Sequence, residues 1–319
     1  MADRARWRAR GVLAGYLLGW WLARRLPERL VRGAFDRVAD VSFRRDGKGV
    51  RRLRSNLARV VPDASPAELA ALTRAGMRSY MRYFCEAFRL PTLSSADINA
   101  RVEIIDEHHF RDALATGRGI VVALPHLANW DLAGAWAAVN TDVGVLSVAE
   151  RLEPAELFER FVTYRNDIGI DIVALAGEDP FPHLVERVRA GRLVCLVADR
   201  DLSARGVGVD FFGATAKMPA GPAALSLRTG AVLMAVTLHY KGTGVGDPLV
   251  VTFSAPIPVT REAGRSATAT ATQRIADVFA AGIAAHPQDW HMLQRIWPET
   301  QPAAQTVAEP DTRSGETAR

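Results

Sequence analysis

The spacing of apolar positions changes once along the chain. Up to about residue 90 they recur at helical intervals, whereas after about residue 100 short apolar runs of strand length alternate with helical stretches. Alternation of this kind is typical of a parallel sheet with helices on both sides. We therefore expect an α/β fold with a mostly parallel central sheet flanked by helices. The expected strands are 102–105, 119–124, 143–148, a short one near 172, 193–198, 232–240 and 249–253.

The first half of the chain carries clear helix boundaries. Ser65 and Pro66 are a cap and a first-turn proline, so they predict the start of a long helix that Pro91 ends. A loop of Thr, Ser and Asp should follow. We expect amphipathic helices that lie at a membrane interface in residues 1–45, an α/β domain in residues 46–298, and a polar, disordered tail in residues 299–319.

The N-terminal region combines an apolar run with a high positive charge. Residues 12–23 are uninterrupted by charge, and residues 1–60 hold 16 Lys and Arg against 5 Asp and Glu, a net charge of +11. Twelve helical residues cover about 18 Å, too little for a hydrocarbon core of about 30 Å. No signal-peptide cleavage site follows the run.

We therefore expect the N-terminal helix to lie on the cytoplasmic face of the plasma membrane, at the level of the anionic headgroups. Leu17, Leu18, Trp20 and Trp21 would be buried shallowly in the lipid. The alternative is a helix packed on its own domain with solvated arginines. Nucleic-acid binding is disfavoured because no recognised reader motif accompanies the arginines.

Several kinds of site are disfavoured by what the sequence lacks. Cys85 and Cys195 lie far apart, so a disulfide framework and a structural zinc are not expected. His108 and His109 have no matching acidic or cysteine ligands, and we expect no metal. The nucleophile elbow, the phosphate-binding loop and the zinc-protease motif are missing, and we expect no cofactor.

The most informative stretch is 119–131, which reads as a buried strand, a loop and the start of a helix. In open α/β proteins such a junction lies at the ligand-binding edge of the sheet. His126 lies in the loop, and Asp131 follows five residues later. An imidazole titrates near neutral pH and suits a general base, which Asp131 would orient. The alternative is a capping aspartate beside a loop histidine without chemistry.

Five blocks of sequence resemble, in order over about residues 10–298, the bacterial lipid A lauroyl/myristoyl acyltransferase superfamily. They are LPHLANWD at 124–131, AER at 149–151 with YR at 164–165, VDFFG at 209–213, MPAGPA at 218–223 and HPQDWH at 286–291. Within the superfamily the chain looks most like the branch that acylates phosphatidylinositol mannosides. The resemblance implies transfer of a long acyl chain, such as palmitoyl, from acyl-CoA to a mannose hydroxyl of that glycolipid.

The resemblance also implies a set of site residues. The catalytic residues would be His126, Asp131 and an acidic residue after the strand that ends at residue 198. The branch has Glu at that position, whereas this chain has Asp199, with Asp201 two residues later. The substrate-binding residues would be Glu150, Arg165, Asn129 and Asp201.

Two further functions stay open from the sequence. One is a lipid A type lauroyl or myristoyl transfer. The other is a non-catalytic protein that binds anionic lipid through residues 1–60 and uses the sheet as a scaffold.

Overall fold

The structure, a computed structural model, describes residues 15, 18–150, 155–175, 179–201, 206–260 and 265–297. The helices are α2 (Glu28–Arg45), α3 (Lys48–Val60), α4 (Pro66–Arg89), α5 (Ser95–Ala100), α6 (Glu107–Ala115), α7 (Trp130–Asn140), α8 (Ala155–Asp167), α9 (Phe181–Arg189), α10 (Gly221–Thr229) and α11 (Arg265–Ala285), with the 3₁₀ turns η1 (Leu90–Thr92) and η3 (Pro287–Asp289). The strands are β1 (Val102–Ile105), β2 (Ile120–Leu124), β3 (Val145–Glu150), β4 (Ile170–Leu175), β5 (Leu193–Val197), β6 (Val207–Phe211), β7 (Ala214–Met218), β8 (Val232–Tyr240) and β9 (Leu249–Phe253).

The core is a seven-stranded sheet with the order β1-β9-β8-β2-β5-β3-β4. Strands β8, β2, β5, β3 and β4 are parallel to one another, while β9 runs antiparallel to β8 and pairs in parallel with β1. Strand β2 lies at the centre and all five of its residues are buried, as expected for a strand covered on both faces. The predicted mostly parallel α/β sheet is confirmed.

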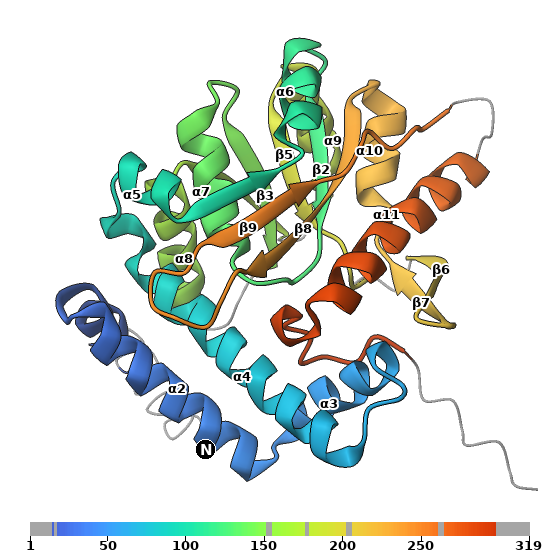
Figure 1. Ribbon diagram of the computed structural model, residues 1–319. Coiled ribbons are helices and arrows are strands. Elements are labelled where there is room, and N and C mark those ends of the chain that lie inside the picture. Colours follow the sequence, from blue (N-terminus) through green and yellow to red (C-terminus); the bar gives the residue numbers. More distant parts are fainter. Residues whose placement is uncertain are drawn as a thin grey trace, which may run out of the picture.

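Two elements were not expected from the sequence. The loop predicted after Pro91 contains the short helix α5, which Ser94 opens with a capping box to Asp97. Strands β6 and β7 form a separate antiparallel hairpin beside α11 (Figure 1). The cap at Ser65 and Pro66 is confirmed, because the Ser65 side chain accepts a hydrogen bond from the Glu68 amide. The expected tail, residues 299–319, lies outside the described residues.

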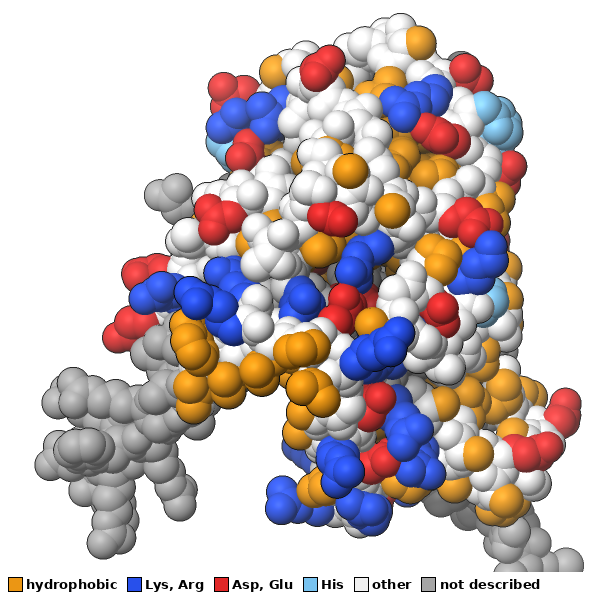
Figure 2. All heavy atoms as spheres, turned by 60° about the vertical axis from the view of Figure 1, so that its left-hand side comes forward, with side chains coloured by type: hydrophobic (Ala, Val, Ile, Leu, Met, Phe, Trp, Pro, Cys, Tyr) orange, Lys and Arg blue, Asp and Glu red, His pale blue; other side chains and the backbone are white. Residues whose placement is uncertain are grey.

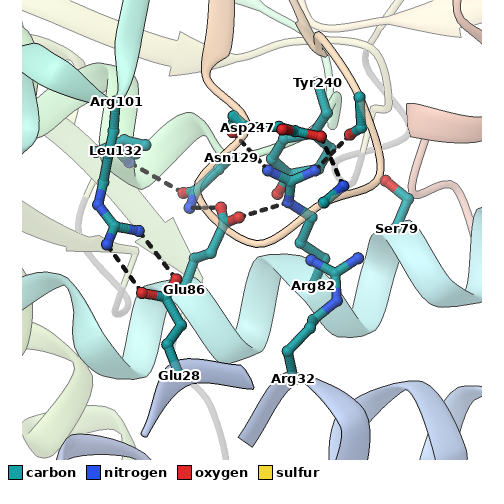
Figure 3. Close-up of polar contacts among 12 residues, drawn as sticks. Glu28, Arg32, Ser79, Arg82, Glu86, Arg101, Asn129, Leu132, Tyr240 and Asp247 are labelled. Atoms are coloured by element: carbon teal, nitrogen blue, oxygen red, sulfur yellow. Dashed lines mark hydrogen bonds and ion pairs between the residues drawn. The ribbon is translucent and has the colours of Figure 1, made fainter. Parts of the chain in front are cut away.

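Helices α2, α3 and α4 lie together below the sheet in Figure 1. A largely buried polar network joins α4 to the rest of the domain (Figure 3). Arg82 binds Glu86 at 2.5 Å, donates to the carbonyls of Gly242 and Asp247 at 2.7 Å each, and lies 3.6 Å from the centre of the Tyr240 ring. The guanidinium therefore fixes α4 against the connection between β8 and β9.

Within the described residues, two separate helices make up the N-terminal helical region that the sequence predicted. A helix over residues 18–25 ends before Pro27, and α2 begins at Glu28. Proline has no amide hydrogen and restricts the residue before it, so it interrupts the ladder of helical hydrogen bonds. No helix within the described ranges has both the length and the apolar content that crossing a membrane requires.

The assignment of Trp20 to the membrane is wrong. Its side chain is only 9% exposed, its Nε1 donates to the Phe88 carbonyl at 3.1 Å, and its ring packs on Phe88, Phe161 and Tyr164. In contrast, Leu18 and Trp21 are 59% and 54% exposed, and Leu17 lies outside the described residues. One face of this helix is therefore core, and the opposite face is available to a partner.

Replacing Arg82 with Met should lower the free energy of unfolding by about 3–5 kcal/mol, because Glu86 would lose its partner in a low-dielectric site. Arg74→Met is the matched control, since Arg74 is also on α4 and pairs with Asp40, but in an exposed position. Chemical denaturation followed by circular dichroism measures both. Equal losses of unfolding free energy in the two variants would show that the buried network stabilises the fold no more than an exposed ion pair does.

Candidate active site

The candidate site is built where two neighbouring parallel strands end. Leu124 of β2 pairs with Val197 of β5, and His126 and Asp199 each follow two residues later. This register brings the two side chains together. The Nδ1 of His126 lies 2.6 Å from Asp199 Oδ1, and the His126 amide donates to Asp199 Oδ2 at 3.0 Å.

The Asp199 carboxylate is fully buried, and among the described residues its hydrogen bonds are with His126 and Trp290. Trp290 Nε1 also donates to Oδ2, at 2.9 Å. Burial alone would raise the pKa of Asp199, but the charge of His126 and the hydrogen bonds from His126 and Trp290 outweigh it and hold the pKa below its usual value. The carboxylate is therefore ionised at neutral pH and favours the tautomer in which Nδ1 carries the hydrogen and Nε2 is free to accept a proton.

Asp131 does not contact the imidazole, so the predicted orienting role of Asp131 is corrected. Its carboxylate accepts hydrogen bonds from the Tyr83 hydroxyl at 2.9 Å and from Arg165 Nε at 3.1 Å. Asp131 is in the first turn of α7, and its side chain points to α4 and α8 instead. The carboxylate that is hydrogen-bonded to the His126 ring is that of Asp199, whereas Asp201 accepts a hydrogen bond from the Gly206 amide.

The other predicted residues occupy different places. Asn129 is fully buried and caps α7 by accepting from the Leu132 amide at 3.0 Å, while its amide group donates to Glu86 at 2.9 Å (Figure 3). Both of its polar groups are therefore hydrogen-bonded within the fold. Asp201 accepts from the Gly206 amide and lines the cavity described below.

Arg165 lines the same cavity, and its ion pair with Asp131 is mostly buried rather than on the surface. Burial alone would lower the pKa of Arg165, but the charge of Asp131 raises it, so the guanidinium is charged throughout the accessible pH range. Glu150 is the last residue of β3, and its side chain lies outside the described part of the chain.

A cavity of about 530 Å³ opens beside His126, Trp130 and Asp131. Because paired residues of parallel strands face the same way, the register places most of its strand residues on one face of the sheet. They are Leu124, Val145, Ser147, Ala149, Ile170, Ile172, Cys195 and Val197. Phe158, Phe161 and Val162 of α8 form another wall. The cavity is mostly apolar, with charged residues near His126.

The depth of the cavity follows from the strand register, in which residues paired across neighbouring strands lie at the same level. Ser147, Ile172 and Cys195 lie one level below the strand ends, and Val145 and Ile170 lie one level further down. Each level is two residues, or about 7 Å along a strand. The cavity therefore extends from His126 along the strands for a distance suited to a long, narrow apolar group.

The cavity wall offers a poor covalent nucleophile. Burial raises the pKa of the Cys195 thiol to about 12, so the thiol stays protonated. Ser147 donates its hydroxyl hydrogen to the Cys195 carbonyl at 2.8 Å. An imidazole base at the mouth of the cavity is therefore suited to activating a hydroxyl that a substrate brings.

Two residues of the site were missed by sequence reasoning. Trp290 lies in the HPQDWH block, which contributed only to the resemblance, and Tyr83 was given no role from the sequence. Neither spacing nor periodicity links position 83 or 290 to the His126 loop, because both contacts are long-range. The HPQDWH block at 286–291, which is part of the resemblance, was the available signal for Trp290.

The sequence is similar to known proteins over most of its length. The sequence profile of the bacterial lipid A biosynthesis acyltransferase family matches residues 8–299. A phosphatidylinositol mannoside acyltransferase of Mycolicibacterium smegmatis is 44% identical over 286 residues, which cover 89% of this chain and 90% of the relative. One of Mycobacterium tuberculosis is 43% identical over 286 residues, 88% of this chain and 87% of the relative.

Proposed function

The chain belongs to the bacterial lipid A biosynthesis acyltransferase family and is an O-acyltransferase, and from this premise we propose that it transfers a palmitoyl chain from acyl-CoA to a mannose hydroxyl of a phosphatidylinositol mannoside. The observation that carries the proposal is the His126–Asp199 pair at the mouth of a long apolar cavity. The named relatives support the choice of acceptor.

In the proposed reaction, His126 Nε2 removes the proton from the acceptor hydroxyl as its oxygen attacks the thioester carbonyl carbon. A carbon–oxygen bond forms, and the tetrahedral intermediate then releases the thiolate of CoA as the carbon–sulfur bond breaks. The imidazolium returns the proton to the thiolate. Asp199 stabilises the imidazolium while it exists, which is the part that a carboxylate has in a hydrolase triad. No cofactor takes part.

The oxyanion of the intermediate needs hydrogen-bond donors. The amide of Leu132 is taken by the Asn129 cap, and that of Ala128 donates to the Asp289 carbonyl. We propose the first-turn amides of Trp130 and Asp131, because the first amides of a helix have no partner within it and carry its positive dipole end. Both residues line the cavity beside His126.

The acyl chain would occupy the apolar part of the cavity. Each buried methylene stabilises binding by about 0.8 kcal/mol, so a cavity that runs two levels down the sheet favours a long chain. The acceptor would lie on the side of Arg165 and Asp131, where a guanidinium meets a phosphodiester and a carboxylate meets sugar hydroxyls. Arg200 and Asp201 line the same cavity.

We also propose that the protein works on the cytoplasmic face of the plasma membrane. Leu18, Trp21, Leu22, Leu26 and Leu30 are exposed on the two N-terminal helices and the bend between them. Figure 2 shows apolar side chains bordering Lys and Arg on this side of the molecule. An apolar surface beside basic side chains suits a membrane with anionic headgroups. Trp20, on the helix over residues 18–25, packs on Phe161 and Tyr164 of α8, so the proposed membrane side would lie next to the cavity wall.

His126→Ala should lower turnover at least about 100-fold, since a general base contributes roughly 10²–10⁴ to rate. Asp199→Asn should lose nearly as much, because the uncharged amide no longer stabilises an imidazolium. Release of free thiol from palmitoyl-CoA in the presence of purified phosphatidylinositol mannoside, with mass spectrometry of the lipid product, measures both. His108→Ala, an exposed histidine on α6, should be unaffected. Retention of more than about a tenth of the turnover in His126→Ala would refute the mechanism.

Ile172→Phe should shift the donor preference towards shorter chains, because the larger ring fills the cavity one level below its mouth. Losing room for three or four methylenes should reduce kcat/KM for palmitoyl-CoA by more than about 10-fold relative to octanoyl-CoA. Val173→Phe is the matched control, since Val173 is the next residue of β4 and faces the other side of the sheet. The same shift in both variants would mean that the cavity does not hold the acyl chain.

Replacing Leu18, Trp21 and Leu22 together with Ser should weaken vesicle binding and leave the fold intact, because all three side chains are exposed. Co-sedimentation of the wild type should need acidic lipid and decline as salt rises, since the Debye length is about 8 Å at 0.15 M. The control variant has Ser in place of Ile105, Val139 and Val245. These three side chains are also exposed, but they do not belong to the N-terminal helices. Salt-independent binding to neutral vesicles would argue against the electrostatic part.

A further inference from the structure

The segment after α11 is clamped to the loop that carries His126. Leu127 and Trp290 form an isolated antiparallel bridge. On either side of it, the Ala128 amide donates to the Asp289 carbonyl at 2.9 Å, and the His291 amide donates to the His126 carbonyl at 2.8 Å. Ala128 has a φ of +44°, a conformation that an alanine adopts only at a cost. The conformation of the loop is therefore stabilised by contacts from this distant segment.

The side chain of Trp290 continues this clamp into the site. Its ring is fully buried against Phe211, Phe212 and Trp297, with ring centres 6.0–6.3 Å away. Its Nε1 points at Asp199 Oδ2, the oxygen that also receives the His126 amide. The buried indole binds Oδ2, while Oδ1 faces the imidazole.

We propose that Trp290 is a positioning residue for the His126–Asp199 pair: its indole N–H fixes the carboxylate and stabilises its negative charge, and so sets the pH at which the pair takes up a second proton. This inference rests on the proposed function, in which that pair is the general base. An indole is an uncharged donor that cannot accept a hydrogen bond, so it favours only the ionised carboxylate. Without it, the pair should bind its second proton at higher pH.

The other ionisable groups around the pair are few among the described residues. His291, on the same segment, has its pKa lowered by burial to about 3 and stays neutral near pH 7. Arg200 and Asp201 follow Asp199 in the chain, and Asp131 with Arg165 lies across the cavity. All of these groups are present in both variants below, so they cancel in the comparison.

The test compares Trp290→Phe with Trp297→Phe. Trp297 belongs to the same aromatic cluster and loses the same volume, but its Nε1 has no hydrogen-bond partner among the described residues. The acid limb of kcat/KM against pH should move up by about one pH unit in Trp290→Phe, as expected for the loss of a hydrogen bond to a charged group. Trp297→Phe should keep the acid limb of the wild type.

A second measurement does not depend on turnover or on the stability of the variant. In the wild type, the indole N–H resonance of Trp290 should titrate with the imidazole of His126 in ¹H–¹⁵N spectra, whereas that of Trp297 should not. Coincident acid limbs in the two variants, or a Trp290 resonance that ignores the titration, would overturn the inference. The proposed function fails separately, if the wild type makes no acylated lipid or if His126→Ala stays active.

Discussion

A single buried carboxylate determines the arrangement of the site. Asp199 has no access to solvent, so its charge is tolerable only because three donors from two distant places in the chain converge on it. Those donors are the main chain and ring of His126 and the indole of Trp290. Each bond therefore does two things: it stabilises the charge, and it fixes the group that makes the bond. The loop after β2, the end of β5 and the segment after α11 are held together in this way.

Around that centre, α4 connects the site with the N-terminal helices. On one side it offers Tyr83 to Asp131, in the first turn of α7, and Glu86 to Asn129, the cap of that helix. On the other side, its Phe88 receives the Trp20 indole. Since α7 begins directly after the His126 loop, the position of α4 bears on the position of the proposed base. The N-terminal helix is thus part of the domain's packing and not a detachable anchor.

How far the sequence predicts the structure depends on the range of each interaction. The strand before His126, the cap of α4 and the alternation of strands and helices are local patterns, and these predictions are confirmed. The partner of His126 is not local. The spacing suggested Asp131, but in the first turn of a helix that side chain turns away from the loop, towards Tyr83 and Arg165. Asp199 becomes the partner only because β5 lies beside β2, and strand order cannot be read from periodicity.

Trp20 illustrates the same limit for surfaces. A tryptophan between arginines has the composition of a membrane anchor, but composition does not say which face of a helix finds a partner. The helix over residues 18–25 uses Trp20 and Ala23 for the core and exposes Leu18, Trp21 and Leu22. Trp20 packs on Phe161, and Phe161 lines the cavity, so the exposed apolar face and the cavity lie on two sides of the same layer of side chains. An acyl chain bound in that cavity and a membrane bound to that face would be separated by little more than α8 and this helix. In the proposed reaction, this arrangement would let the acceptor lipid stay in the membrane while its hydroxyl reaches His126.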